Sequence, residues 1–223
     1  IIGYGQLLKE EAEETDDRSM RADLTRILDA AYYLMRLIDM ILDLAKIEAG
    51  RMSFDVRPHH VGALLDKAVA ARRDLIEDRR NQVRVEIEAG LDRVEIDGHR
   101  FLQILDAILE NAATHTEDGL ITLTAARDAG GRTPSFRVEI ADTGDGIPPE
   151  QMATLFKTFA TAQSAATGRY GGTGLNLAVC HQLCGAMDGS VDVRSAPGAG
   201  TTITVTMPLA PRPSPANVPT GGA

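Results

Sequence analysis

The chain has only two cysteines among its 223 residues, no long uncharged apolar run and no surplus of basic residues. A membrane-spanning helix needs about 18 or more consecutive apolar residues, so we expect no membrane contact in this fragment. The 23 Lys and Arg are outnumbered by 32 Asp and Glu, which gives a net charge of −9. Nucleic-acid binding draws its affinity from clustered Lys and Arg. The composition therefore disfavours nucleic acid as a partner, and any anionic ligand must be held locally.

The two cysteines lie four residues apart, as Cys180 and Cys184, in a segment with helical periodicity. Two positions on one helix face have poor geometry for a disulfide. We interpret them as core thiols in a reducing compartment. A metal site built from Cys180, His181 and Cys184 is the alternative, but no fourth ligand lies nearby in the sequence.

The first fifty residues have the periodicity of a helical hairpin. Stretch 1–14 is helix-like, and the polar residues 15–19 offer a turn. From residue 24 onward, apolar residues recur at alternating spacings of four and three, the pattern of a coiled-coil seam: Leu24, Leu28, Ala31, Met35, Ile38, Leu42 and Ala45. Two helices alone cannot bury both faces, so we expect residues 1–50 to dimerise into a four-helix bundle. A helix pair packed on its own domain is the alternative.

After Gly50 the pattern changes to short strands mixed with helices. Residues 51–209 are predicted to form an α+β domain, a two-layer sandwich with helices on one face of a mixed sheet. The Pro- and Gly-rich end, 210–223, is predicted to be a disordered tail or linker. The expected elements are strand 53–56, helix 61–79, strands 83–88 and 93–96, helix 99–115, strands 120–127 and 135–141, helices 149–156 and 174–186, and strands 190–195 and 200–207.

Two glycine-containing segments have the composition of ligand-binding loops. Strand 135–141 runs into Asp142-Thr143-Gly144-Asp145-Gly146, where an acidic acceptor precedes glycines that let a ligand approach the backbone. Gly171-Gly172-Thr173-Gly174 stands directly before a helix, where backbone N–H groups can meet phosphate oxygens. The intervening loop, 157–172, has a length typical of a lid or a disordered segment. Each motif alone is weak, because D-x-G-x-G is a turn as often as a site.

The helix expected at 99–115 carries polar residues next to its apolar face. Gln103 is interpreted as part of the solvated face. Glu110 and Asn111 abut the apolar face, where an unpaired polar group would be costly, so they are candidates for a functional role. The apolar face consists of Phe101, Ile104, Leu105, Ile108, Leu109 and Ala112.

In order and spacing, these segments resemble the histidine kinases of the GHKL ATPase superfamily. The resemblance covers nearly everything before the tail and implies a two-layer sandwich of the GHKL (Bergerat) type, preceded by a phosphoacceptor hairpin. Four matching boxes in order are far more specific than any one of them. The matching segments are Gln103–Thr116 (N box), Val138–Pro148 (first glycine box), Leu155–Phe159 (F box) and Gly171–Ala178 (second glycine box), with Ile1–Leu8 and Ile41–Gly50 in the hairpin.

The resemblance implies a site for ATP with Mg²⁺. Asp142 would accept a hydrogen bond from the adenine amine, because an ionised carboxylate is only an acceptor. Gly144 and Gly146 would let the purine approach the backbone, and Thr201 would help to hold a water molecule. Asn111 would give its side-chain oxygen to Mg²⁺. The other residues that the resemblance implies are Glu110, as general base for the acceptor histidine, and Arg169, Gly172, Gly174 and Leu175, as further ATP-binding residues.

Three positions depart from the family pattern. Ala107 stands where the family usually has an Asn, Thr114 where it has Lys or Arg, and Asn176 where it has Gly. The first two remove polar groups from the phosphate side. A nucleotide- or partner-binding pseudokinase is therefore the alternative to an active histidine kinase. The coiled-coil seam helix and the residues that end it, 46–50, disfavour membership of another class of GHKL ATPase.

By resemblance, the phosphorylated histidine would lie about nine residues before Ile1, some two and a half helical turns away. The chain starts without an initiator Met, which we interpret as a cut inside a longer protein, and it is not expected to autophosphorylate. Its five histidines all lie outside the hairpin: His59, His60, His99, His115 and His181. The resemblance implies a homodimer through the hairpin and a response regulator receiver domain as partner. It also implies the bacterial cytoplasm, with a membrane-bound upstream part left open.

Overall fold

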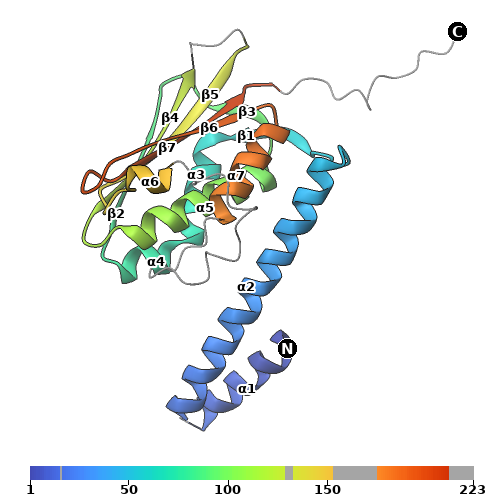
Figure 1. Ribbon diagram of the computed structural model, residues 1–223, viewed down its shortest axis with the longest axis vertical. Helices are drawn as coiled ribbons and strands as arrows, with labels where there is room; N and C mark the ends of the chain where they lie inside the picture. Colours follow the sequence, from blue (N-terminus) through green and yellow to red (C-terminus); the bar gives the residue numbers. More distant parts are fainter. Residues whose placement is uncertain (16, 129–132, 153–174, 211–223) are drawn as a thin grey trace, which may run out of the picture. The chain divides into compact units, whose positions relative to one another are not determined.

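The computed structural model describes residues 1–15, 17–128, 133–152 and 175–210 (Figure 1). The chain divides into two compact units, Ile1–Met52 and Ser53–Ala223. No described helix is both long enough and apolar enough to cross a bilayer. Most of the predicted loop 157–172 and tail 210–223 falls outside the described residues.

The first unit is a hairpin of helices α1 (Ile2–Glu14) and α2 (Arg18–Glu48). Helix α2 begins inside the predicted turn 15–19 because the Asp17 carboxylate accepts the Met20 amide at 3.0 Å and caps the helix. The helices approach closely at Gly5, where a Cβ would lie 2.8 Å from a methyl group of Leu28. Leu28 is buried, but farther along the seam Ile38 is 50% exposed. The hairpin by itself therefore covers only part of the seam.

The second unit contains a mixed five-stranded sheet, as the sequence predicts. Its strand order is β2-β4-β5-β7-β6, in which β2 and β4 are parallel and the other neighbours are antiparallel. The strands are β2 (Gln82–Ile87), β4 (Leu120–Asp128), β5 (Ser135–Asp142), β6 (Ser190–Ser195) and β7 (Thr201–Pro208).

Helices cover one face of this sheet (Figure 1). Alternate residues of β5 and β7 are buried, so that face is the core, and the residues between them are partly exposed. The ring of Phe101, on the helix that follows β3 (Arg93–Asp97), packs edge-to-face against the ring of Phe136 on β5, with ring centroids 5.7 Å apart. This arrangement confirms the predicted two-layer sandwich. The helices of this unit are α3 (Val61–Ala71), α4 (Arg73–Asp78), α5 (Gly98–His115), α6 (Pro149–Met152) and α7 (Leu175–Ala186).

Two predicted elements near the start of the unit are wrong. The strand predicted at 53–56 is instead β1 (Val56–His60), which pairs antiparallel with β3 (Arg93–Asp97) in a separate two-stranded sheet. The preceding Asp55 amide bonds to the Asp97 side chain, so the ladder starts only at Val56. The helix predicted at 61–79 is broken at Arg72 into α3 and α4. Ile76 of α4 is still buried, so the apolar spacing of the sequence continues across the break. The sequence therefore gives no sign that the helix is interrupted.

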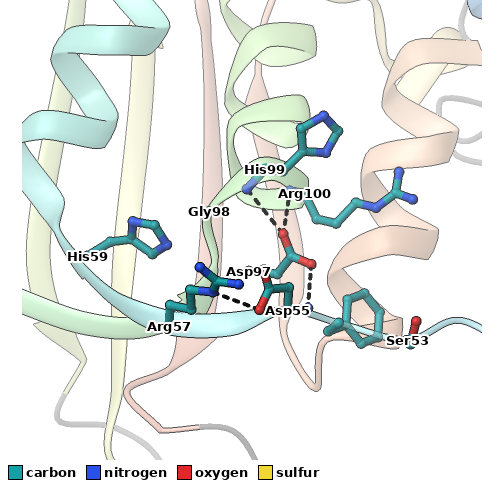
Figure 2. A pocket seen from close by; sticks show the side chains of 9 residues that line it. Ser53, Asp55, Arg57, His59, Asp97, Gly98, His99 and Arg100 are labelled. Atoms are coloured by element: carbon teal, nitrogen blue, oxygen red, sulfur yellow. Dashed lines mark hydrogen bonds and ion pairs between the residues drawn. The ribbon is translucent and has the colours of Figure 1, made fainter.

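The carboxylate of Asp97 fixes the start of α5 (Figure 2). Its Oδ1 accepts the amides of His99 and Arg100, both at 3.1 Å, and its Oδ2 accepts the Asp55 amide at 2.9 Å. The side chain is 7% exposed and borders a pocket of about 570 Å³. One buried side chain thus caps the helix and anchors the chain where it enters β1.

We expect Asp97→Ala to destabilise the second unit by about 2–3 kcal/mol, since it removes a helix cap and leaves the Asp55 amide without its acceptor. Urea unfolding is the measurement. Asp192→Ala is the matched control, because among the described contacts Asp192 forms only an exposed ion pair with Arg194, and it should change stability by less than about 0.5 kcal/mol. Equal losses in the two variants would contradict the anchoring role of Asp97.

Candidate functional site

The predicted site residues that the structure describes come from α5, β5, the loop after β5 and the start of β7. Glu110 and Asn111 lie in the last two turns of α5, and Asp142 ends β5. Antiparallel pairing of β5 with β7 brings Asp142 beside Thr201. Four predicted residues cannot be placed as side chains: Arg169, Gly172 and Gly174 lie outside the described residues, and Leu175 is described only as the first residue of α7.

Asp142 is a buried carboxylate, 8% exposed. Its Oδ1 accepts the backbone amides of Gly144 at 2.9 Å and Thr201 at 3.1 Å. Burial raises the pKa of Asp142 above its ordinary value, and the two amides, the nearby His115 and the Thr116 hydroxyl oppose that rise only in part. Both described backbone hydrogen bonds fall on Oδ1, so Oδ2 can also accept from a donor on a ligand.

The glycines of the loop after β5 are required by backbone packing. A Cβ on Gly144 would lie 2.1 Å from the carbonyl oxygen of His115, and one on Gly146 would lie 1.9 Å from that of Ala196. Gly146 also has φ +72°, which disfavours a side chain. These glycines were predicted to let a ligand approach the backbone. In the structure they also allow the loop to pack closely against the end of α5 and the β6–β7 turn.

Ser195, at the end of β6, is a residue that the sequence analysis missed. Its hydroxyl accepts the Ile147 amide at 2.7 Å, donates to the Gly200 carbonyl at 2.8 Å and lies 2.9 Å from Thr201 Oγ1. Since its single proton goes to Gly200, the Thr201 hydroxyl must be the donor in the last contact. Thr201 Oγ1 therefore keeps its lone pairs for a donor such as a water molecule.

Thr116 is a second residue that the sequence analysis assigned no role. Its hydroxyl is buried, at 1% exposed, and lies close enough to the Asp142 carboxylate to lower the pKa of Asp142, but it forms no hydrogen bond of ordinary geometry within the described part of the chain. It lies 2.8 Å from the position of a Cβ on Gly144 and lines a pocket of about 480 Å³ together with His115 and Thr143. A buried polar group without a partner is costly, so this hydroxyl suits a ligand or a bound water.

Glu110 belongs to a charged cluster that no sequence motif indicated. Arg72, at the break between α3 and α4, donates from Nε and Nη2 to the two carboxylate oxygens of Asp106, each at 2.5 Å. The same Nη2 donates to Glu110 Oε2 at 3.2 Å. Burial lowers the pKa of Arg72, but the bond to Asp106 and the charges of Asp106 and Glu110 outweigh it and raise that pKa. The only signal in the sequence is the spacing of Asp106 and Glu110, four apart on one helix face.

The two cysteines are free and buried. Burial raises the pKa of Cys184 to about 12 and that of Cys180 well above its ordinary value. Both thiols therefore stay protonated and pack as apolar groups. Within the described ranges, no three His, Cys, Asp or Glu side chains form a group that could hold a metal ion.

The chain resembles known proteins over nearly its whole length. Residues 96–211 match the family model of histidine kinase-, DNA gyrase B-, and HSP90-like ATPases. The chain is 33% identical to autoinducer 2 sensor kinase/phosphatase LuxQ of Vibrio parahaemolyticus, over 95% of the chain and 25% of LuxQ. It is also 33% identical to circadian input-output histidine kinase CikA of Synechococcus elongatus, over 99% of the chain and 30% of CikA. The chain thus spans less than a third of either relative.

A solved structure with the same fold is full-length ShkA in complex with AMPPNP. It superimposes with a TM-score of 0.74 at 25% identity, over 96% of this chain and 43% of ShkA. The likeness extends over both the hairpin and the α+β unit, since the part covered exceeds either unit alone.

Asp142→Asn should stabilise the nucleotide-free protein more at about pH 7 than at about pH 4. Folding raises the pKa of Asp142, so proton binding contributes stability at low pH, and that contribution is lost as pH rises through the folded pKa. Asparagine cannot ionise and does not suffer this loss. Thermal unfolding of both proteins across this range is the measurement, with Asp192→Asn as an exposed control. A Tm difference that stays constant with pH would contradict the expectation.

Proposed function

The chain belongs to the histidine kinase-, DNA gyrase B-, and HSP90-like ATPase family, and from this premise we propose that its second unit binds Mg·ATP and transfers the γ-phosphoryl group to a histidine. The observation that carries the proposal is the buried Asp142 carboxylate, held through Oδ1 by the amides of Gly144 and Thr201. Two further facts support it: the relative CikA is a histidine kinase, and the similar structure of ShkA is a complex with AMPPNP.

Asp142 selects adenine in this proposal. Its Oδ2 accepts a hydrogen bond from the exocyclic amine of adenine, whereas guanine would place a carbonyl oxygen against the carboxylate. The Thr201 Oγ1 lone pairs and the Thr116 hydroxyl, which lies near Asp142 and has no hydrogen bond of ordinary geometry to the described residues, suit a water molecule beside the base. Gly144 and Gly146 keep the loop wall free of side chains.

Asn111 is the proposed Mg²⁺ ligand. Its side-chain amide makes no hydrogen bond to any residue that the structure describes, and its oxygen is the hard donor that Mg²⁺ prefers. The ion would neutralise phosphate charge during transfer. Arg169, Gly172, Gly174 and Leu175 are proposed to contact the phosphates, where the start of α7 offers backbone N–H groups.

Glu110 is the proposed general base. It accepts the proton from the imidazole N–H of the acceptor as the N–P bond forms and the bond to the leaving ADP oxygen breaks. Residues 1–50 contain no histidine, so the acceptor must be supplied from outside the hairpin segment present here. The receiver domain of a response regulator then takes the phosphoryl group, in the bacterial cytoplasm.

Dimerisation through the hairpin is part of the proposal. Met35, Ile38 and Leu42 of the seam are 46%, 50% and 52% exposed, and α1 covers only the other end of α2. A second hairpin would bury these side chains in a four-helix bundle. Since each is about half exposed, each would contribute about half of the roughly 1.5–3 kcal/mol that burial of a fully exposed apolar side chain provides.

Asp142→Asn should weaken ATP binding by about 10- to 100-fold, because a hydrogen bond to a charged group contributes about 1.5–3 kcal/mol. Isothermal titration with Mg·ATP measures this directly. Asp192→Asn is the control: this acid is exposed on β6 and does not line the pocket beside Thr116, so its substitution should leave affinity within about twofold. Equal affinities for wild type and Asp142→Asn would remove Asp142 from the adenine site.

Once an acceptor histidine is supplied on the hairpin, Asn111→Ala should abolish phosphohistidine formation, because the phosphate charge loses its counter-ion. Glu110→Gln should slow transfer by about 10²- to 10⁴-fold with ATP affinity unchanged, since a general base acts only in the chemical step. Labelling with radioactive ATP and titration of nucleotide are the paired readouts. Tight ATP binding without any labelling of the wild type would instead identify a nucleotide-binding pseudokinase.

A further inference from the structure

We propose that Arg72 is a positioning residue for Glu110 and that Asp106 holds Arg72 in place. The inference rests on the proposed role of Glu110 as general base. Arg72 lies outside every motif that indicated the site, at the break between α3 and α4. Its guanidinium is nevertheless bonded to both acidic residues on this face of α5.

The geometry gives the two carboxylates different roles. Asp106 receives a bidentate fork, with Nε on Oδ1 and Nη2 on Oδ2, both at 2.5 Å. A fork of this kind fixes the plane of the guanidinium. Glu110 receives a longer bond of 3.2 Å from the same Nη2. Asp106 therefore orients the guanidinium, and the oriented guanidinium helps to position the Glu110 carboxylate.

The cluster is sheltered enough to work at physiological salt. The Arg72 side chain is 17% exposed and that of Glu110 is 27% exposed, so ions screen this contact less than a surface pair. Asp106 and Glu110 are also like charges four residues apart on a helix, which repel each other. Arg72 bridges the two carboxylates and so offsets this repulsion.

The experiment uses the full chain with an acceptor histidine supplied on the hairpin. We expect Arg72→Met to lower the single-turnover transfer rate at saturating ATP by about tenfold, with ATP affinity changed by less than about twofold. Arg72→Lys should recover part of the rate. Arg80→Met is the matched control, since Arg80 pairs only with exposed Asp118 and Glu117 in the described contacts, and its rate should equal that of the wild type.

Asp106→Asn tests whether the fork on Asp106 is what holds Arg72 in place. This variant keeps Arg72 but weakens the fork that orients its guanidinium, so the transfer rate should fall while ATP affinity stays unchanged. A wild-type transfer rate in Asp106→Asn would overturn the proposal.

A double-mutant comparison assigns the effect to Glu110. Arg72→Met should have no further effect on transfer in the Glu110→Gln background, and equal losses in both backgrounds would overturn the positioning role while leaving the general base intact. If Glu110→Gln alone transfers at the wild-type rate, the general-base assignment fails and the positioning role falls with it. Thermal unfolding of each variant shows whether it is folded, and Asp106→Asn, which keeps Arg72, carries the test if Arg72→Met does not fold.

Discussion

The packing of helix α5 on strand β5 is the constraint on which the site depends. Phe101 and Phe136 join the two elements in the core, and the helix is nearly fully buried along its apolar face. Its start is fixed by the Asp97 cap and its end by the loop after β5, whose Asp145 amide donates to the His115 carbonyl. With both ends held, the last turns of α5 present Glu110 and Asn111 at a fixed position relative to Asp142.

The site is built at some expense to stability. Asp142 is buried with a raised pKa, and the Thr116 hydroxyl is buried without a hydrogen bond in the described part of the chain. Both features destabilise the native state, because a buried carboxylate is desolvated even when two amides bond to it, and a buried hydroxyl without a well-formed hydrogen bond loses the bond it makes to water. Both lie against Gly144, whose backbone is pressed on the end of α5. Their coincidence at one loop is more simply explained by ligand binding than by two unrelated packing defects.

Much of the fold could be predicted from the sequence because local patterns and long-range packing agree there. The alternation in strands 120–127 and 135–141 and the apolar face of helix 99–115 are strong periodic signals, and the mixed two-layer sandwich follows from them. The predicted strand at 53–56 failed because the Asp55 amide is captured by a side chain 42 residues away. The break at Arg72 was missed for the same reason: a contact across 34 residues accompanies it.

The site was predictable where its residues sit in short motifs and hidden where they act through tertiary contacts. Asp142 stands at a strand end before glycines, which is a local signal. Ser195 and Arg72 have no such signal, because each acquires its partners only when β6 meets β7 or when α3 ends against α5. The glycine loop was assigned to ligand approach, yet its closest neighbours are the protein's own carbonyl groups. Sequence patterns therefore indicated that this loop is constrained but not what constrains it.

Two of the positions on α5 that depart from the family pattern, Ala107 and Thr114, change which polar groups this helix presents. Ala107 offers no polar atom, and the Thr114 hydroxyl donates to the Glu110 carbonyl at 2.6 Å, within the helix, so neither side chain extends a donor away from the helix. The charge on this part of α5 is instead concentrated in Asp106 and Glu110, and both are tied to Arg72 at the break between α3 and α4. Like charges four residues apart on a helix repel each other, and the repulsion is stronger in a partly desolvated position. Arg72 offsets that repulsion, so the two carboxylates can remain on one face of α5.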